Sequence, residues 1–241
     1  MQTTRPEVLL RHLEWRRELR NIMGRISHDY AVKEEAQVFE RYFSRREDVS
    51  LGLNEGGYRG REAVAGYFRA LGDEIALSSR LIAKAFPEEL GDKSAEELLG
   101  VGLITYLPFE SQVIEIARDE QTAKGIWNVR GSDCRLTASG PVSCWTYGYA
   151  AVDFVREDDA WRIWHMQLYY IIHQPCGTVF GHPQTAFPVF EAFAPMADFS
   201  LPEPNVPGPL FESFRADRPV IAPPACPRPY DSFQNTFSYA V

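Results

Sequence analysis

The sequence predicts an α+β domain, in which long helices come first and pack on one face of a curved antiparallel sheet. Two patterns support this fold class. Apolar residues recur at three- and four-residue steps in the first part of the chain, which is the helical period, and alternate with polar residues in the middle part, as in a half-buried strand. Helices followed by a run of strands are typical of α+β domains.

The helical period predicts three helices before the sheet. They cover residues 6–30, 32–43 and 60–71, and each places its apolar side chains on one side. A short strand at residues 49–53 and a turn at residues 54–57 are expected between the second and third helices. Another short helix is expected around residues 94–99.

Four runs rich in β-branched and aromatic residues predict the strands of the sheet. These runs are residues 113–117, 123–129, 143–154 and 161–172. Acidic residues at 119–120 and 157–159 predict the hairpin turns between neighbouring strands. The strands are therefore expected to form an antiparallel meander.

The last part of the chain is rich in proline and in aromatic residues. Proline at this density excludes helix and sheet interiors. A disordered tail rarely contains so many rings, because each buried ring contributes roughly 2 kcal/mol of transfer free energy and each exposed one favours aggregation. We therefore predict a domain at residues 1–174 and an extended arm at residues 175–241, packed on this domain or on a second subunit. A loose tail is the alternative.

Composition argues against several functions. Apolar residues make up 45% and charged residues 24% of the 241 residues, which is enough for a packed core. The net charge is −8 and no basic block is present, so nucleic acid is not the expected partner. No long apolar run predicts a membrane span, and arginines interrupt the N-terminal segment, so we expect a cytoplasmic protein. The four cysteines lie too far apart for a zinc or redox motif and are expected as reduced thiols.

Strand alternation groups the candidate site residues. In the last strand one face carries Trp161, Ile163, His165, Gln167 and Tyr169. Arg162 lies on the other face, beside an acidic turn, so the face with His165 is expected to point inward. In the preceding strand Trp145, Tyr147 and Tyr149 share a face with Asp153, and the direction of that face stays open.

Three motifs carry a resemblance to a known superfamily. They are His28-Asp29-Tyr30, then Tyr58-Arg59-Gly60-Arg61-Glu62-Ala63-Val64, and finally Asp153-Phe154-Val155-Arg156-Glu157-Asp158 followed by Trp161-Arg162-Ile163-Trp164-His165. Over residues 7–173 the chain resembles the SnoaL-like branch of the nuclear transport factor 2-like (NTF2-like) superfamily. The resemblance implies a cone of helices closed against a bent sheet, with an apolar pocket inside. Members include isomerases, dehydratases and non-catalytic proteins, so the fold does not name the reaction.

His165 is the main catalytic candidate, because an unperturbed imidazole titrates near pH ~6.5 and exchanges protons at neutral pH. A histidine that is merely hydrogen-bonded in the core is the alternative. The resemblance to scytalone dehydratases adds His28, Asp29 and Tyr30 at the end of the first helix, and Arg59 is a candidate clamp for a phenolate or carboxylate. The expected substrate-binding walls are Tyr58, Trp127, Trp145, Tyr147, Tyr149, Gln167 and Tyr169.

We expect an enzyme without a metal or organic cofactor, since the sequence has no dinucleotide, P-loop or nucleophile-elbow motif. The expected reaction is an acid–base elimination on a hydrophobic aromatic small molecule. The long form with an aromatic tail resembles the diarylpropane and phenylcoumaran lyases that release formaldehyde from lignin-derived dimers, which implies a lyase. A dehydratase, an isomerase, a non-catalytic binding module and a dioxygenase small subunit are the alternatives. The resemblance also implies a homodimer or higher homo-oligomer.

Overall fold

A computed structural model describes residues 6–137, 140–178, 200–219, 222 and 224–241. The helices are α1 (Pro6–Ala31), α2 (Val38–Tyr42), α3 (Arg61–Ala85), α4 (Pro87–Leu90) and α5 (Ala95–Leu98), with 3₁₀ turns η1 (Glu35–Gln37) and η2 (Phe233–Asn235). The strands are β1 (Ser50–Gly52), β2 (Gly56–Arg59), β3 (Ile104–Tyr106), β4 (Phe109–Ile116), β5 (Thr122–Thr137), β6 (Gly140–Glu157), β7 (Ala160–Pro175) and β8 (Val206–Pro207).

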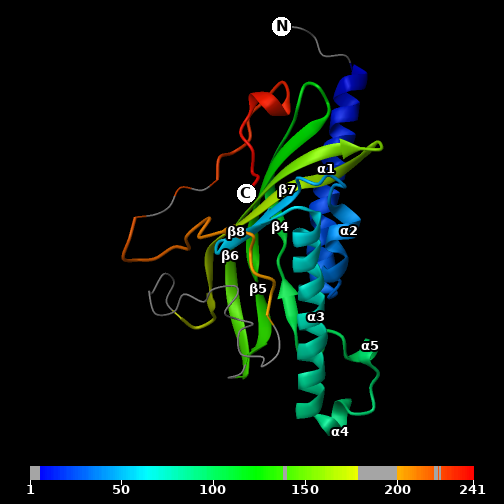
Figure 1. Cartoon of the computed structure of the whole chain (residues 1–241), viewed down its shortest axis with the longest axis vertical. Coiled ribbons are helices and arrows are strands. Elements are labelled where there is room, and N and C mark those ends of the chain that lie inside the picture. Colours follow the sequence, from blue (N-terminus) through cyan, green and yellow to red (C-terminus); the bar gives the residue numbers. More distant parts are fainter. Residues whose placement is uncertain (1–5, 138–139, 179–199, 220–221, 223) are drawn as a thin grey trace.

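The strands form one sheet in the order β3-β5-β6-β7-β1-β2-β8, with β4 also paired to β5. All pairings are antiparallel except that of β1 with β7. The helices α1 and α3 run along one face of the long, curved strands (Figure 1). The predicted α+β fold, with N-terminal helices closed against a curved antiparallel sheet, is confirmed.

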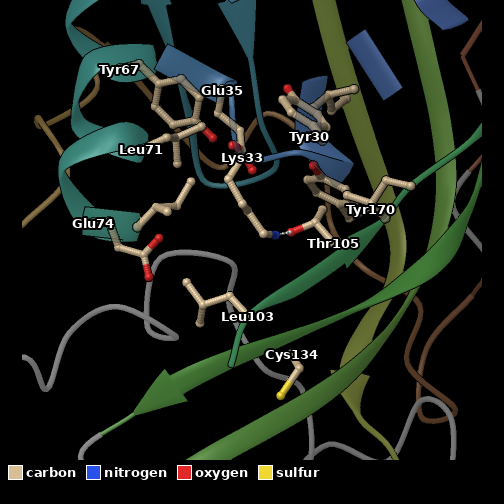
Figure 2. A pocket seen from close by; sticks show the side chains of 13 residues that line it. Tyr30, Lys33, Glu35, Tyr67, Leu71, Glu74, Leu103, Thr105, Cys134 and Tyr170 are labelled. Atoms are coloured by element: carbon tan, nitrogen blue, oxygen red, sulfur yellow. Dashed lines mark hydrogen bonds between the residues drawn. The ribbon is translucent and has the colours of Figure 1, made fainter. Parts of the chain in front are cut away.

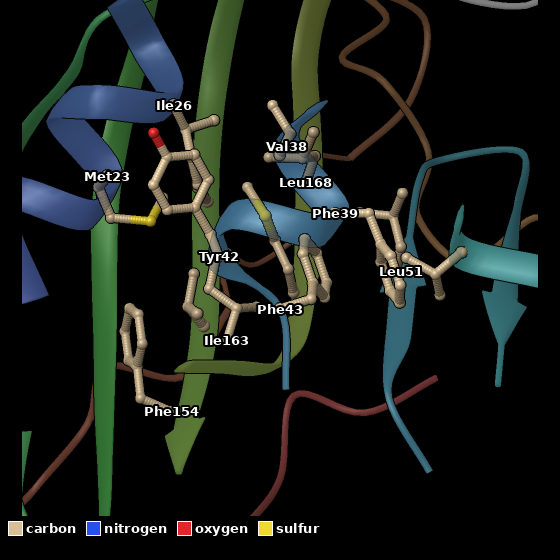
Figure 3. Packing of buried hydrophobic residues seen from close by; sticks show 14 of the residues in the cluster. Met23, Ile26, Val38, Phe39, Tyr42, Phe43, Leu51, Phe154, Ile163 and Leu168 are labelled. Atoms are coloured by element: carbon tan, nitrogen blue, oxygen red, sulfur yellow. The ribbon is translucent and has the colours of Figure 1, made fainter. Parts of the chain in front are cut away.

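The core lies between these helices and the sheet. The helix α1 contributes Leu19, Met23 and Ile26, which are fully buried, as the predicted apolar stripe requires. From the sheet, Phe154 and Ile163 point toward them (Figure 3). We call this helix-covered side of the sheet the inner face, and the opposite side the outer face.

A β-bulge in β7 reverses the predicted alternation. The register shifts between the pairs Asp153↔His165 and Phe154↔Ile163, so Trp164 is an extra residue on β7. Before the bulge, Trp161 packs edge-on against Trp15 of α1, with ring centroids 5.6 Å apart. After it, the inner face carries Met166, Leu168 and Tyr170, while His165, Gln167 and Tyr169 lie on the outer face. The prediction that His165 points into the cone is therefore wrong.

The described part of the C-terminal segment packs on the outer face of the sheet. A Cβ atom on Gly52 or Gly57 would lie 2.6 Å from a methyl group of Val241, so glycine at both positions makes room for this contact. Tyr239 is buried, and its backbone N–H donates to Asp153 (2.8 Å). Of the predicted arm, residues 179–199, 220–221 and 223 lie outside the described residues.

Several predicted boundaries were wrong. The helix expected over residues 32–43 is shorter and consists of η1 and α2, because residues 32–34 form the loop after α1. The helix α3 continues to Ala85 rather than ending near residue 71. Gly56 and Gly57, expected to lie in a turn, instead begin β2, which pairs with β1. By contrast, the predicted hairpin turn between β6 and β7 is present, with positive φ at Asp158 (48°) and Asp159 (62°), as a tight hairpin turn requires.

Candidate functional site

A cavity of about 50 Å³ lies between the inner face and the helices. Its lining residues come from the end of α1, the loop after it, α3, and strands β3, β5 and β7. They are Tyr30, Lys33, Glu35, Tyr67, Leu71, Glu74, Ile75, Leu103, Thr105, Leu107, Cys134, Leu168 and Tyr170. The cavity is thus mostly apolar but contains one amine, two carboxylates and three phenols, a composition that suits small-molecule binding.

Lys33 is the central polar residue of the cavity. Its ammonium donates to the Oγ1 atom of Thr105 at 2.6 Å, and the side chain is buried. In Figure 2 it lies between Glu74 on α3 and the phenols of Tyr30 and Tyr170. The backbone of Lys33 has φ of 66°, an uncommon value outside glycine, so the loop after α1 holds the amine here at some conformational cost.

The two carboxylates are both buried. Glu35 is 6% exposed and Glu74 only 2%, and Glu74 accepts a hydrogen bond from Ser78 one turn later on α3 (3.2 Å). Buried carboxylates are uncommon in soluble proteins, because desolvation penalises the charged form. An amine and two carboxylates around one small cavity supply both an acid and a base for proton transfer.

Residues behind the cavity wall fix the positions of Tyr170 and Tyr67. Asn54 clamps Tyr170, since its amide donates to the carbonyl (2.8 Å) and its oxygen accepts from the N–H (3.0 Å). Tyr67 packs against Tyr58 with ring centroids 5.0 Å apart, and the Tyr58 hydroxyl donates to the carbonyl of Pro202 in the arm (2.7 Å). Burial raises the pKa of Tyr58, with Glu55 adding to the effect, so this phenol stays protonated.

The three residues of the motif at the end of α1, His28, Asp29 and Tyr30, lie in three different environments. Tyr30 lines the cavity. Asp29 is buried but turned away, where it accepts from the Tyr42 hydroxyl (2.9 Å) and pairs with Arg41 (3.2 Å). Burial first, and then Asp29, raise the pKa of Tyr42 to about 12. His28 is exposed to solvent.

Other predicted residues lie away from the cavity. Arg59 is exposed, and its Nε donates to the carbonyl oxygen of Val241 (2.7 Å). Tyr58 lies behind Tyr67 rather than in the lining. Trp127 is a core residue, 1% exposed, that packs edge-on against Phe154.

The remaining predicted residues lie on the outer face, and the structure brings several of them together there. Trp145 is 40% exposed. The other members of this set are Tyr147, Tyr149, His165, Gln167 and Tyr169. Tyr169 donates to Oε1 of Gln167 (2.7 Å), and burial raises its pKa to about 12. The predicted grouping of these residues on one face is correct, but the face is the one covered by the arm.

His165 belongs to a buried ionic network on the outer face. Its Nδ1 lies 2.9 Å from Oδ2 of Asp153, whose other oxygen binds the ammonium of Lys124 at 2.5 Å. Lys124 and Asp153 have fully buried side chains. Burial alone raises the pKa of Asp153, but the hydrogen bond from His165 and the charge of Lys124 outweigh it and lower that pKa. Burial lowers the pKa of Lys124, against the opposing effect of Asp153.

Sequence reasoning missed the polar residues of the cavity. Lys33 and Glu35 lie in the segment expected as the start of the second helix, where they fall among its polar residues; in the structure Lys33 is in a loop and Glu35 begins η1. Glu74 had a readable signal: it lies three residues after Leu71 and one before Ile75, on the apolar side of α3, and the helix was predicted to end before it. Lys124, which lies on the outer face rather than in the cavity, also had a readable signal in the sequence, because it interrupts an apolar strand.

Together, the fold and the cavity define a protein in which N-terminal helices close against a curved antiparallel sheet, with a polar cavity between them. No family model matches the sequence, and no curated protein is similar to it. A hexachlorocyclohexane dehydrochlorinase, LinA-type3, from Novosphingobium barchaimii is similar in structure, with TM-score 0.47 and 13% identity over 70% of this chain and 95% of that one.

Two further solved structures are similar to the chain. An NTF2-like protein with a cystatin-like fold from Novosphingobium aromaticivorans has TM-score 0.43 and 16% identity, over 72% of this chain and 90% of that one. An NTF2-like superfamily protein from Salmonella enterica has TM-score 0.44 and 13% identity, over 68% and 94%. Likenesses at these identities and TM-scores carry no argument about the reaction, which is therefore argued from the cavity. Among the described residues, every helix is too short or too polar to span a bilayer.

Proposed function

We propose that this chain is a cofactor-independent lyase that acts by acid–base catalysis on a hydrophobic aromatic small molecule, with the Lys33 cavity as its active site. The observation that carries the proposal is the convergence of Lys33, Glu35 and Glu74 in a mostly apolar cavity. A buried charged group is weak evidence for stability, because apolar residues of similar size often stabilise as well. Buried acids and bases in a cavity are instead typical of catalytic sites.

The substrate class is a phenolic diaryl compound with a benzylic hydroxyl and a neighbouring hydroxymethyl group, as in lignin-derived dimers. Glu35 takes the proton of the phenol and Lys33 protonates the benzylic hydroxyl, which leaves as water as the quinone methide forms. Glu74 then removes the proton of the hydroxymethyl group, and the carbon–carbon bond breaks to release formaldehyde. The bonding electrons return to the phenolate oxygen, so a diol yields an alkene, water and formaldehyde. At the end of the cycle Glu35 returns its proton to the phenolate oxygen and Glu74 returns the hydroxymethyl proton to Lys33. Tyr30 and Tyr170 donate to the developing phenolate.

The cavity is smaller than the proposed substrate. A cavity of about 50 Å³ holds only one or two water molecules, whereas ligand pockets measure roughly 300–1,000 Å³. Entry of a diaryl compound therefore requires the lining to open. Leu103 lies between the cavity and solvent on a loop with two glycines of positive φ, Gly100 (79°) and Gly102 (73°), and we propose that this loop moves.

Formaldehyde release from a phenolic diarylpropane diol tests the proposal. Lys33→Met and Glu74→Gln should each reduce turnover by about 10²–10⁴-fold, the range for loss of a general acid or base. Lys93→Met, at an exposed lysine, is the matched control and should retain full activity. Full turnover by Lys33→Met would contradict the assignment. A dehydrated product that keeps its hydroxymethyl group would indicate a dehydratase instead, and an isomer that loses no water would indicate an isomerase.

A further inference from the structure

The ring of Phe233, in the C-terminal arm, fills a slot on the outer face of the sheet. We propose that this slot is a second binding site, separate from the cavity, whose ligand class is a small neutral phenol and whose present occupant is the ring of Phe233. The inference goes beyond the proposed function, because it concerns residues on the opposite face of the sheet. The argument rests on the walls of the slot, on the anchoring of the arm and on the polar groups within reach.

Three side chains form the walls of the slot. The ring of Trp164 lies against that of Phe233, with centroids 4.5 Å apart and planes at 38°. The ammonium of Lys124 lies 4.6 Å from the ring centroid, which is cation–π geometry. His165 completes the slot at 6.0 Å between centroids and is itself stacked on Trp164. A ring in this position is thus held by an indole, a cation and an imidazole, as a bound aromatic ligand would be.

The arm is anchored on both sides of Phe233 by contacts that do not involve its ring. Before it, Asp231 pairs with Arg118 (2.8 Å), and the Tyr230 hydroxyl lies 3.1 Å from that of Thr122. After it, the backbone N–H of Tyr239 donates to Asp153. Phe233 itself is only partly buried and stands on a single 3₁₀ turn, η2. Removal of this ring should therefore empty the slot while the arm stays docked.

The polar groups of the slot select a phenol rather than an anion or a hydrocarbon. Lys124 and Asp153 neutralise each other, so an aromatic carboxylate would lack a counter-charge. His165 uses Nδ1 toward Asp153, and the described residues form no hydrogen bond to its Nε2. That nitrogen is an acceptor for a hydroxyl group when Nδ1 carries the proton. An electron-rich phenol ring also suits the Lys124 cation better than an unsubstituted one.

A ligand in this slot would compete with the chain's own arm. A phenol that binds where the Phe233 ring lies removes that contact and leaves the arm held only by its flanking anchors. Concentrations of phenolic compounds high enough to displace the ring would thus loosen the arm. How tightly the arm is held would then depend on the phenol concentration, while the Lys33 cavity stays unchanged.

The test compares p-cresol and toluene, which differ by one hydroxyl group, as ligands of the full-length Phe233→Ala protein in calorimetric titrations. We expect saturable binding of p-cresol, about fivefold to tenfold tighter than that of toluene, as one buried hydrogen bond contributes. Phe233→Leu, which refills the slot with an aliphatic side chain, is the matched control and should bind neither compound.

Three further readouts complete the test. Adding Lys33→Met to Phe233→Ala should leave p-cresol affinity unchanged, because the cavity is elsewhere. Circular dichroism and slow exchange of the Tyr239 amide should show that the Phe233→Ala protein is folded with its arm docked. The proposal is overturned by no saturation with p-cresol, by equal affinity for toluene, by equal binding to Phe233→Leu, by dependence on Lys33, or by release of the arm in Phe233→Ala.

Discussion

Substitution of Asp153 by asparagine should be among the most destabilising single changes in this protein. Each oxygen of this buried carboxylate is used: Oδ1 binds Lys124, and Oδ2 binds His165, the hydroxyl of Ser238 (2.8 Å) and the N–H of Tyr239. Asparagine keeps the size but loses the charge and replaces one acceptor with a donor. Lys124 is then left as a buried cation without its counter-charge.

Breaking a buried ion pair from one side costs about 3–5 kcal/mol. For a chain of this size, 1 kcal/mol shifts the melting temperature by about 2–4 °C, so we expect a fall of roughly 6–20 °C. Urea unfolding measures the free energy and thermal unfolding the melting temperature, both followed by circular dichroism. Asp158→Asn is the control, because Asp158 and Arg45 form an exposed pair (3.2 Å), and such pairs contribute about 0–1 kcal/mol.

A double-mutant cycle separates the pair from its surroundings. Lys124→Met alone should also destabilise, because it leaves Asp153 buried without its cation. The double variant Lys124→Met/Asp153→Asn should then cost clearly less than the two single changes together, since neither group is left as an unpaired charge. A loss below about 1 kcal/mol in Asp153→Asn, or strict additivity in the cycle, would refute the reasoning.

Three more predictions concern acid stability, the cavity loop and the Tyr170 clamp. The folded-state pKa of Asp153 lies below its unfolded value near ~3.9, so its stabilisation is present above that pH and disappears as the pH falls through the folded value. Urea unfolding as a function of pH should show this loss in the wild type and not in Asp153→Asn. Gly100→Ala should destabilise by about 1–3 kcal/mol and reduce turnover, because φ is 79° and the new Cβ would lie 2.5 Å from Cγ of Lys33; equal stability and equal turnover would contradict this. Asn54→Ala should cost about 1–3 kcal/mol by removing the side-chain acceptor of the Tyr170 N–H and one of the two donors to its carbonyl, the other being Ser213, and faster exchange of the Tyr170 amide should report it.

Local patterns in the sequence were sufficient to predict the layers of the fold. The apolar stripe of α1 and the alternation of the long strands each repeat over many residues, so single exceptions do not obscure them. The direction of His165 depends instead on one extra residue, Trp164. A bulge keeps the period of two on either side of it and changes only the phase, so every side chain that follows is reversed.

The cavity residues were harder to predict for a different reason. Lys33 is buried because the chain after α1 turns beneath α3, and this is a tertiary contact with no local period. Tyr30 could be predicted from a motif, because it lies in the last turn of the amphipathic helix α1. Glu74 shows an intermediate case, in which a correct helix boundary would have placed a carboxylate on the apolar side of α3.

The C-terminal segment has a consequence for assembly. Where it lies over the strands around His165, the chain has already covered this surface with its own residues. A second copy that approached this side would meet the arm rather than bare strands, whereas the leucines near the start of α1, Leu9, Leu10 and Leu13, face solvent. Any oligomer of this protein would then differ in geometry from one built by stacking bare sheets back to back.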